Sequence, residues 1–213
     1  MSLLDSVLEQ MTENLDQRRE ELTKLRRVVL RYAGQTLEST VARMAIPIVY
    51  ANWEGYVKEV CQLYLEHIEA IGLAHHHLQP AILGYLWTPL LRRLTGGLNF
   101  ERKTAVAESA LRSLGDPVSF ANTEKAIDTR SKLNYENLES IGQSLCLDIA
   151  ALAPRKRHLN LLVHLRNNIA HGSPPRSLSY ADFDEHASQT LELMEDFERV
   201  VISALQTRSF CTT

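Results

Sequence analysis

The chain has 213 residues, of which 45% are hydrophobic and 23% charged, and its formal net charge is −3. This composition is typical of a globular protein, and the presence of only 9 glycines and 7 prolines argues against repetitive turns and many short strands. The net charge provides no overall attraction to nucleic acid or to an anionic membrane, so a polyanionic ligand would have to meet a local basic patch.

The length and the cysteine pattern limit the remaining classes. A chain of this size suits one domain, and we expect a single domain over residues 1–213. Cys61, Cys146 and Cys211 are an odd number without a CxxC pair, which favours free thiols over a disulfide framework or a cysteine-bound metal. The N-terminal segment resembles neither a signal nor a transit peptide, and no stretch approaches the ~20 apolar residues that span a bilayer. We therefore expect a cytoplasmic protein without cofactor or metal.

Two long helices are expected first along the chain. Apolar residues recur at steps of three, four and seven over residues 2–32, which predicts an amphipathic helix whose other face carries many charges. A second helix is expected over about residues 36–72, with a kink or restart at Pro47. Its broad apolar stripe includes Trp53, so this helix should be the central one of a bundle.

Shorter elements follow. Three adjacent histidines occupy residues 75–77. Because adjacent side chains cannot all converge on one metal ion, we interpret them as polar residues of a loop or helix end. Pro80 and Pro89 should interrupt residues 78–93, and helices are expected over about residues 100–114 and 133–145.

A penultimate long helix carries the most informative pattern. Pro154 is expected in its first turn, and Gly172, which two prolines follow, should end it. On a helical wheel the core-facing arc contains Leu161, Leu162, Leu165 and Ile169. Arg166 then lies at the edge of the arc, whereas Asn167 and His171 point away from the core. The last helix is expected over about residues 180–206.

The outward polar face has two interpretations. A helix C-terminus stabilises cations, so Arg166 and a protonated His171 need no function there. Alternatively, a histidine that exchanges a proton and an arginine that holds phosphate oxygens could cleave RNA without a metal, through attack of the ribose 2′-hydroxyl on the adjacent phosphorus. Two copies related by a two-fold axis would enclose such a pair in one cleft. Arg157 and His164 form a second pair with similar spacing.

Three blocks of the sequence resemble one family. The motif Arg166-Asn167-Asn168-Ile169-Ala170-His171 is similar to that of the HEPN superfamily, in which Arg is followed four to six residues later by His. The segments YANWEGYVKEVCQLYLEHI at 50–68 and SKLNYENLESIGQSLCLD at 131–148 resemble the MAE_28990/MAE_18760-like HEPN subgroup. The chain departs from this subgroup at Asn52, where a histidine is usual before the tryptophan.

The resemblance implies an all-α HEPN-like bundle of long antiparallel helices with short accessory helices. It further implies a homodimeric, metal-independent endoribonuclease, often encoded in toxin–antitoxin or anti-phage loci, with RNA as substrate and an antitoxin or defence protein as partner. Arg166 and His171 would be catalytic, and Asn167, Asn168 and Glu54, the glutamate of the Trp-Glu-Gly block, would support them. Two alternatives stay open: a HEPN-like module that binds RNA or protein without cutting, and a helical adaptor that uses its charged first helix.

Overall fold

The protein is built from helices. The computed structural model describes residues 2–92, 100–120, 127, 129, 132–172 and 177–212, and these residues form no strand beyond two isolated bridges. The α-helices are α1 (Leu3–Leu30), α2 (Glu38–Ala70), α3 (Pro80–Leu86), α4 (Thr88–Arg92), α5 (Phe100–Ser113), α6 (Tyr135–Leu145), α7 (Lys156–Ala170) and α8 (Tyr180–Thr207). Two 3₁₀ helices, η1 (His75–His77) and η2 (Ile149–Arg155), precede α3 and α7. The expected all-α fold is confirmed.

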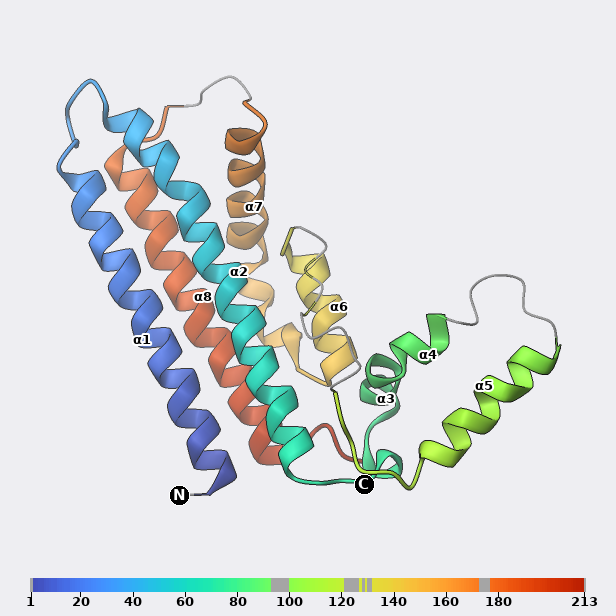
Figure 1. Cartoon of the computed structure of the whole chain (residues 1–213). Helices are drawn as coiled ribbons and strands as arrows, with labels where there is room; N and C mark the ends of the chain where they lie inside the picture. Colours follow the sequence, from blue (N-terminus) through green and yellow to red (C-terminus); the bar gives the residue numbers. More distant parts are fainter. Residues whose placement is uncertain are drawn as a thin grey trace.

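Helix α2 is the centre of the bundle, as its apolar stripe predicted. It packs against α1, α8 and α7, and Figure 1 shows α1, α2 and α8 side by side, with α1 antiparallel to the other two. Trp53 of α2 is fully buried and meets Phe197 of α8 edge to face, with ring centroids 5.9 Å apart. Helix α2 continues through Pro47 without a restart. No described helix is long and apolar enough to cross a membrane.

The charged face of α1 fastens it to its neighbours. Arg18 forms an ion pair of 2.7 Å with Glu59 of α2, and Arg26 forms one of 2.8 Å with Asp184 of α8. A capping box between Ser2 and Asp5 begins the helix, because each donates a backbone N–H to the side chain of the other. Helix α1 therefore joins the bundle through polar pairs at its rim as well as through its buried apolar stripe.

A second group of elements covers one side of the long helices. Helix α6 packs against α3 and η2, and η2 packs against α8. The chain returns to this group at its C-terminal end, where Gln79 N–H donates to Phe210 O at 2.8 Å. Helix α5 stands apart from the bundle in Figure 1, and none of its residues is buried.

Helix α7, which carries the Arg-to-His motif, differs from the expected helix at its N-terminal end. Pro154 lies in η2 rather than in the first turn of α7, which begins at Lys156. Its other end is as predicted: His171 is the C-cap residue, and Gly172 adopts φ +67°, a left-handed conformation that glycine takes without strain. Because η2 packs against α8, the start of α7 is held close to the core.

The turn that joins α6 to η2 provides a test of this packing. A Cβ atom added at the buried Gly142 would overlap Cγ1 of Ile149 and lie 3.1 Å from the carbonyl oxygen of Leu147. Since Cγ1 belongs to a branched, buried side chain that cannot swing away, we expect Gly142→Ala to lower the free energy of unfolding by about 1–3 kcal/mol, measured by urea denaturation.

Gly84 is the matched control, because it lies inside α3 with no atom within 4 Å of the added Cβ. We expect Gly84→Ala to raise the free energy of unfolding by about 0.5–1 kcal/mol, the ordinary helical advantage of alanine. Equal effects of the two substitutions would contradict the close approach at Gly142.

Candidate functional site

The candidate site is centred on Arg166, near the C-terminal end of α7. The Arg166 side chain is half-buried, and its Cζ lies 4.9 Å from the centroid of the Tyr50 ring on α2. Nη1 of Arg166 also donates to Oδ1 of the neighbouring Asn167 at 2.9 Å. A guanidinium at this distance from an aromatic face is attracted by the negative potential of the ring.

The buried face of α7 is not the one predicted from its aliphatic residues. Leu161, expected in the core, is 39% exposed. The buried residues of the helix are His158, Leu159, Leu162, Val163 and Leu165. The true face is therefore turned by about 50° from the predicted arc, so that Arg166 belongs to it rather than to its edge. Asn167 was predicted to point away from the core, but it is half-buried.

Tyr50 connects Arg166 to a polar cluster that includes Glu54. The Tyr50 hydroxyl accepts the Leu133 N–H at 2.7 Å and donates to the Glu54 carboxylate. Glu54 in turn accepts hydrogen bonds from Lys58 Nζ at 3.0 Å and from the Thr129 hydroxyl. The structure thus brings Glu54 into the surroundings of Arg166, with Tyr50 between them.

Two pKa shifts describe the charge state of this cluster. Burial, together with the nearby Glu54 charge, raises the pKa of Tyr50 to about 12, so Tyr50 is a neutral phenol at physiological pH. Burial alone would raise the pKa of Glu54, but the hydrogen bonds from Thr129 and Lys58 outweigh it and lower the pKa. Glu54 is therefore an ionised acceptor whose charge Lys58 balances.

His171 occupies a different position from Arg166. It is exposed at the end of α7, and its backbone N–H donates to Asn167 O at 2.9 Å. Five helical residues rotate a side chain by about 140°, so the two motif residues leave the helix in different directions. In one chain the structure does not bring Arg166 and His171 together.

The remaining supporting residue is also directed elsewhere. Asn168 Nδ2 lies 2.9 Å from Nε2 of His164, the residue one turn earlier on α7. Asn168 is therefore oriented toward the second Arg/His pair of this helix rather than toward Arg166. Arg157, the other member of that pair, is exposed and lines a cavity of about 430 Å³ between α7 and α8.

A histidine pair fixes α7 to α8 beside this cavity. The His158 ring is buried, its Nε2 lies 3.1 Å from Thr190 Oγ1, and its centroid is 5.6 Å from that of His186. Burial, together with the nearby charges of His186 and Arg155, lowers the pKa of His158 to about 4. His158 is thus a neutral anchor of the motif helix, which sequence reasoning left unassigned.

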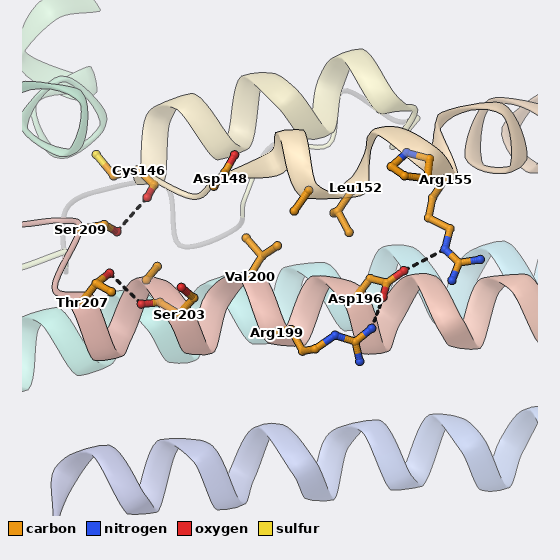
Figure 2. A pocket seen from close by; sticks show the side chains of 13 residues that line it. Cys146, Asp148, Leu152, Arg155, Asp196, Arg199, Val200, Ser203, Thr207 and Ser209 are labelled. Atoms are coloured by element: carbon orange, nitrogen blue, oxygen red, sulfur yellow. Dashed lines mark hydrogen bonds and ion pairs between the residues drawn. The ribbon is translucent and has the colours of Figure 1, made fainter.

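A larger cavity, of about 540 Å³, lies between η2 and α8, away from the motif end of α7. Figure 2 shows Arg155 and Arg199 both directed at Asp196 along its wall. Arg155 donates to Asp196 at 2.8 Å and to Glu192 at 2.6 Å. These pairs hold η2 against α8 and balance the two cations, so the cavity offers no excess of positive charge to a phosphate.

The other titratable candidates do not form a site. His75 is buried, whereas His76 and His77 are exposed in η1. Among the described residues, no three histidine, cysteine, aspartate or glutamate side chains are placed to hold one metal ion. The three cysteines are free thiols.

The comparisons with known proteins agree with this architecture. The MAE_28990-like HEPN family matches residues 7–210, nearly the whole chain. No curated protein and no solved structure matches the chain significantly. The chain therefore belongs to the MAE_28990-like HEPN family, and its helical bundle is a HEPN fold.

Sequence reasoning missed Tyr50 as a site residue. One local signal was present: Tyr50 lies four residues before Glu54, so the two share one face of α2. The contact between Tyr50 and Arg166 could not be predicted from this spacing, because it depends on how α7 packs against α2.

The buried neutral His158 predicts a pH dependence of stability. Its pKa is about 4 in the folded protein and about 6.5 in an unfolded chain, so only the unfolded state takes up this proton between those values. As pH falls from 7 to 4, the free energy of unfolding should decrease by an amount on the order of 3 kcal/mol from this residue. Urea denaturation of wild type and His158→Gln across this range measures it, and the variant should lose that part of the slope.

His164→Gln is the control, because it removes an exposed histidine from the same helix. It should keep the wild-type pH dependence. The assignment of His158 is wrong if His158→Gln and wild type lose stability in parallel as the pH falls.

Proposed function

We propose that this protein is a cytoplasmic, metal-independent endoribonuclease with a single HEPN-like domain, and that Arg166 and His171 carry the reaction. The ribose 2′-hydroxyl attacks the adjacent phosphorus and the 5′ oxygen leaves, so the products carry 2′,3′-cyclic phosphate and 5′-hydroxyl ends. His171 transfers the proton, and Arg166 stabilises the charge that develops on the phosphate oxygens. Membership of the family supports this assignment.

The observation that carries the proposal is that Arg166 is half-buried without a carboxylate partner among the described residues. Of the other half-buried arginines in the described part of the chain, Arg18, Arg26 and Arg155 each bind a carboxylate, whereas Arg43 does not. Arg166 instead rests on the Tyr50 ring and, among the described residues, donates only to Asn167. Since a guanidinium has five N–H donors, Arg166 keeps a full charge and several donors for a phosphate.

The separation of Arg166 from His171 supports a homodimer. Because the two side chains leave α7 in different directions, one chain alone offers an arginine without its histidine. A second copy related by a two-fold axis would supply His171 to the Arg166 of the first, and the reverse. Each of the two identical sites would then contain one residue from each copy.

We further propose single-stranded or looped RNA as the substrate and a toxin or anti-phage role restrained by a partner protein. A nucleotide that is not paired can rotate its 2′-hydroxyl into line with the leaving oxygen, whereas A-form geometry restrains it.

Asn167 is well placed to orient the two catalytic residues, because its Oδ1 accepts a hydrogen bond from Arg166 and its carbonyl accepts the N–H of His171.

The first experiment asks whether the motif cuts RNA without metal. Purified protein is incubated with single-stranded RNA in EDTA, and the product ends are identified. We expect cleavage by wild type and a loss of about 100-fold or more in both Arg166→Ala and His171→Ala, because each removes a group needed in the transition state. A protein that binds RNA yet leaves it intact would be the non-catalytic HEPN-like module.

Arg157→Ala and His164→Ala are the matched controls, since both residues are exposed on the same helix and have the same residue types. They should cleave at close to the wild-type rate. Full activity in Arg166→Ala or His171→Ala overturns the assignment, as does a loss confined to the control pair.

The second experiment tests the shared site directly. Arg166→Ala and His171→Ala chains, each inactive alone, are co-expressed so that they assort at random. Half of the dimers are then mixed, and one of the two Arg–His pairs in each mixed dimer is intact. We therefore expect about a quarter of the wild-type cleavage rate. If the arginine and histidine of the same chain act together, mixing restores nothing.

A further inference from the structure

We propose that Tyr50 is a positioning residue for the reaction: its ring holds the Arg166 guanidinium in place while leaving the charge and donors of Arg166 available to a phosphate. This inference rests on the proposed function of Arg166. It concerns a residue outside the Arg-to-His motif and on another helix.

The Tyr50 ring is itself held in place. Tyr50 is 2% exposed, so the surrounding core restricts its rotamer. Its hydroxyl is held from two sides, by the Leu133 N–H at 2.7 Å and by the Glu54 carboxylate. A side chain fixed at both the ring and the hydroxyl provides a rigid surface for the half-buried Arg166, whose Cζ is 4.9 Å from the ring centroid.

An aromatic ring holds an arginine without using its charge or its N–H donors. A carboxylate that held Arg166 would occupy two N–H donors and cancel its charge, as Asp196 and Glu192 do for Arg155. The face of a ring orients the guanidinium plane without accepting its in-plane N–H groups. The ring therefore restricts the side chain and leaves it able to bind an anion.

The nearby Glu54 carboxylate is engaged by other partners and does not pair with Arg166. The carboxylate of Glu54 accepts from Lys58 Nζ at 3.0 Å, from the Thr129 hydroxyl and from the Tyr50 hydroxyl. Its charge is balanced by Lys58 on the same helix. The charge and acceptors of Glu54 are thus engaged by Lys58, Thr129 and Tyr50, and the described residues show no ion pair between Glu54 and Arg166.

The test compares Tyr50→Leu, which removes the ring, with Tyr50→Phe, which keeps it. A cation–π contact of this kind corresponds to about 3- to 30-fold in rate, and we expect kcat for RNA cleavage to fall by that factor in Tyr50→Leu with a smaller change in KM. Tyr50→Phe should restore kcat to within about 3-fold of wild type. Thermal unfolding confirms that each variant is folded at the assay temperature.

Tyr56→Leu is the matched control, because it removes another buried tyrosine ring from α2. It should lower the thermal midpoint while keeping the wild-type kcat. A general loss of packing would lower kcat in both leucine variants. Equal kcat in wild type and a folded Tyr50→Leu, or equal losses in Tyr50→Leu and Tyr56→Leu, overturns the proposal.

A measurement without RNA separates this inference from the proposed function. In wild type we expect nuclear Overhauser contacts between Arg166 Hε and the Tyr50 ring protons, and an Hε signal shifted by the ring current. The shift should persist in Tyr50→Phe. Absence of the contacts overturns the positioning role even if RNA is cleaved and even if Tyr50→Leu fails to fold. Contacts in a protein that does not cleave RNA would refute the proposed function alone.

Discussion

The contact between Arg166 and the Tyr50 ring is the interaction on which the packing of α7 and the candidate site both depend. The charge of an arginine cannot be removed at neutral pH, so an arginine on the buried face of a helix needs a partner that tolerates a cation. Tyr50 meets this need from α2, the helix against which α1, α7 and α8 all pack. Helix α7 can therefore bury one face in the bundle and still hold a cation near its C-terminal end.

The long helices could be predicted because their burial follows a local period. The expected limits of the first and last helices agree with α1 and α8 within about two residues, and the stripe around Trp53 correctly placed α2 at the centre. Pro154 misled the prediction of the start of α7, because a 3₁₀ helix accepts proline in its short turns as readily as an α-helix accepts it at its start.

The buried face of α7 was predicted only in part, because the predicted arc leaves out the aliphatic residues Leu159 and Val163 and because a wheel does not show partners from distant parts of the chain. The predicted arc centres the face on the side of Leu161. In the folded protein Leu159 and Val163 extend it on the other side, and the half-buried Arg166 lies on this extension against the Tyr50 ring. A wheel shows directions but not partners: His158 is buried beside Thr190 and Arg166 lies against Tyr50, because a specific acceptor and a specific ring are placed there. The same limit concealed Tyr50, which the sequence presents as one more aromatic residue of a core helix.

The distribution of charge explains how a chain with a net charge of −3 can still have a site for a polyanion. Many of its charges are joined in pairs between helices, such as Arg26 with Asp184 and Arg155 with Asp196, and these add little to the field outside. In the proposed function, attraction to RNA would then depend on contacts at short range, where Arg166 lacks a carboxylate partner. In the proposed dimer two such arginines and two histidines would surround one cleft, which a flexible strand can enter with its phosphates, whereas a rigid duplex keeps them on its outer surface.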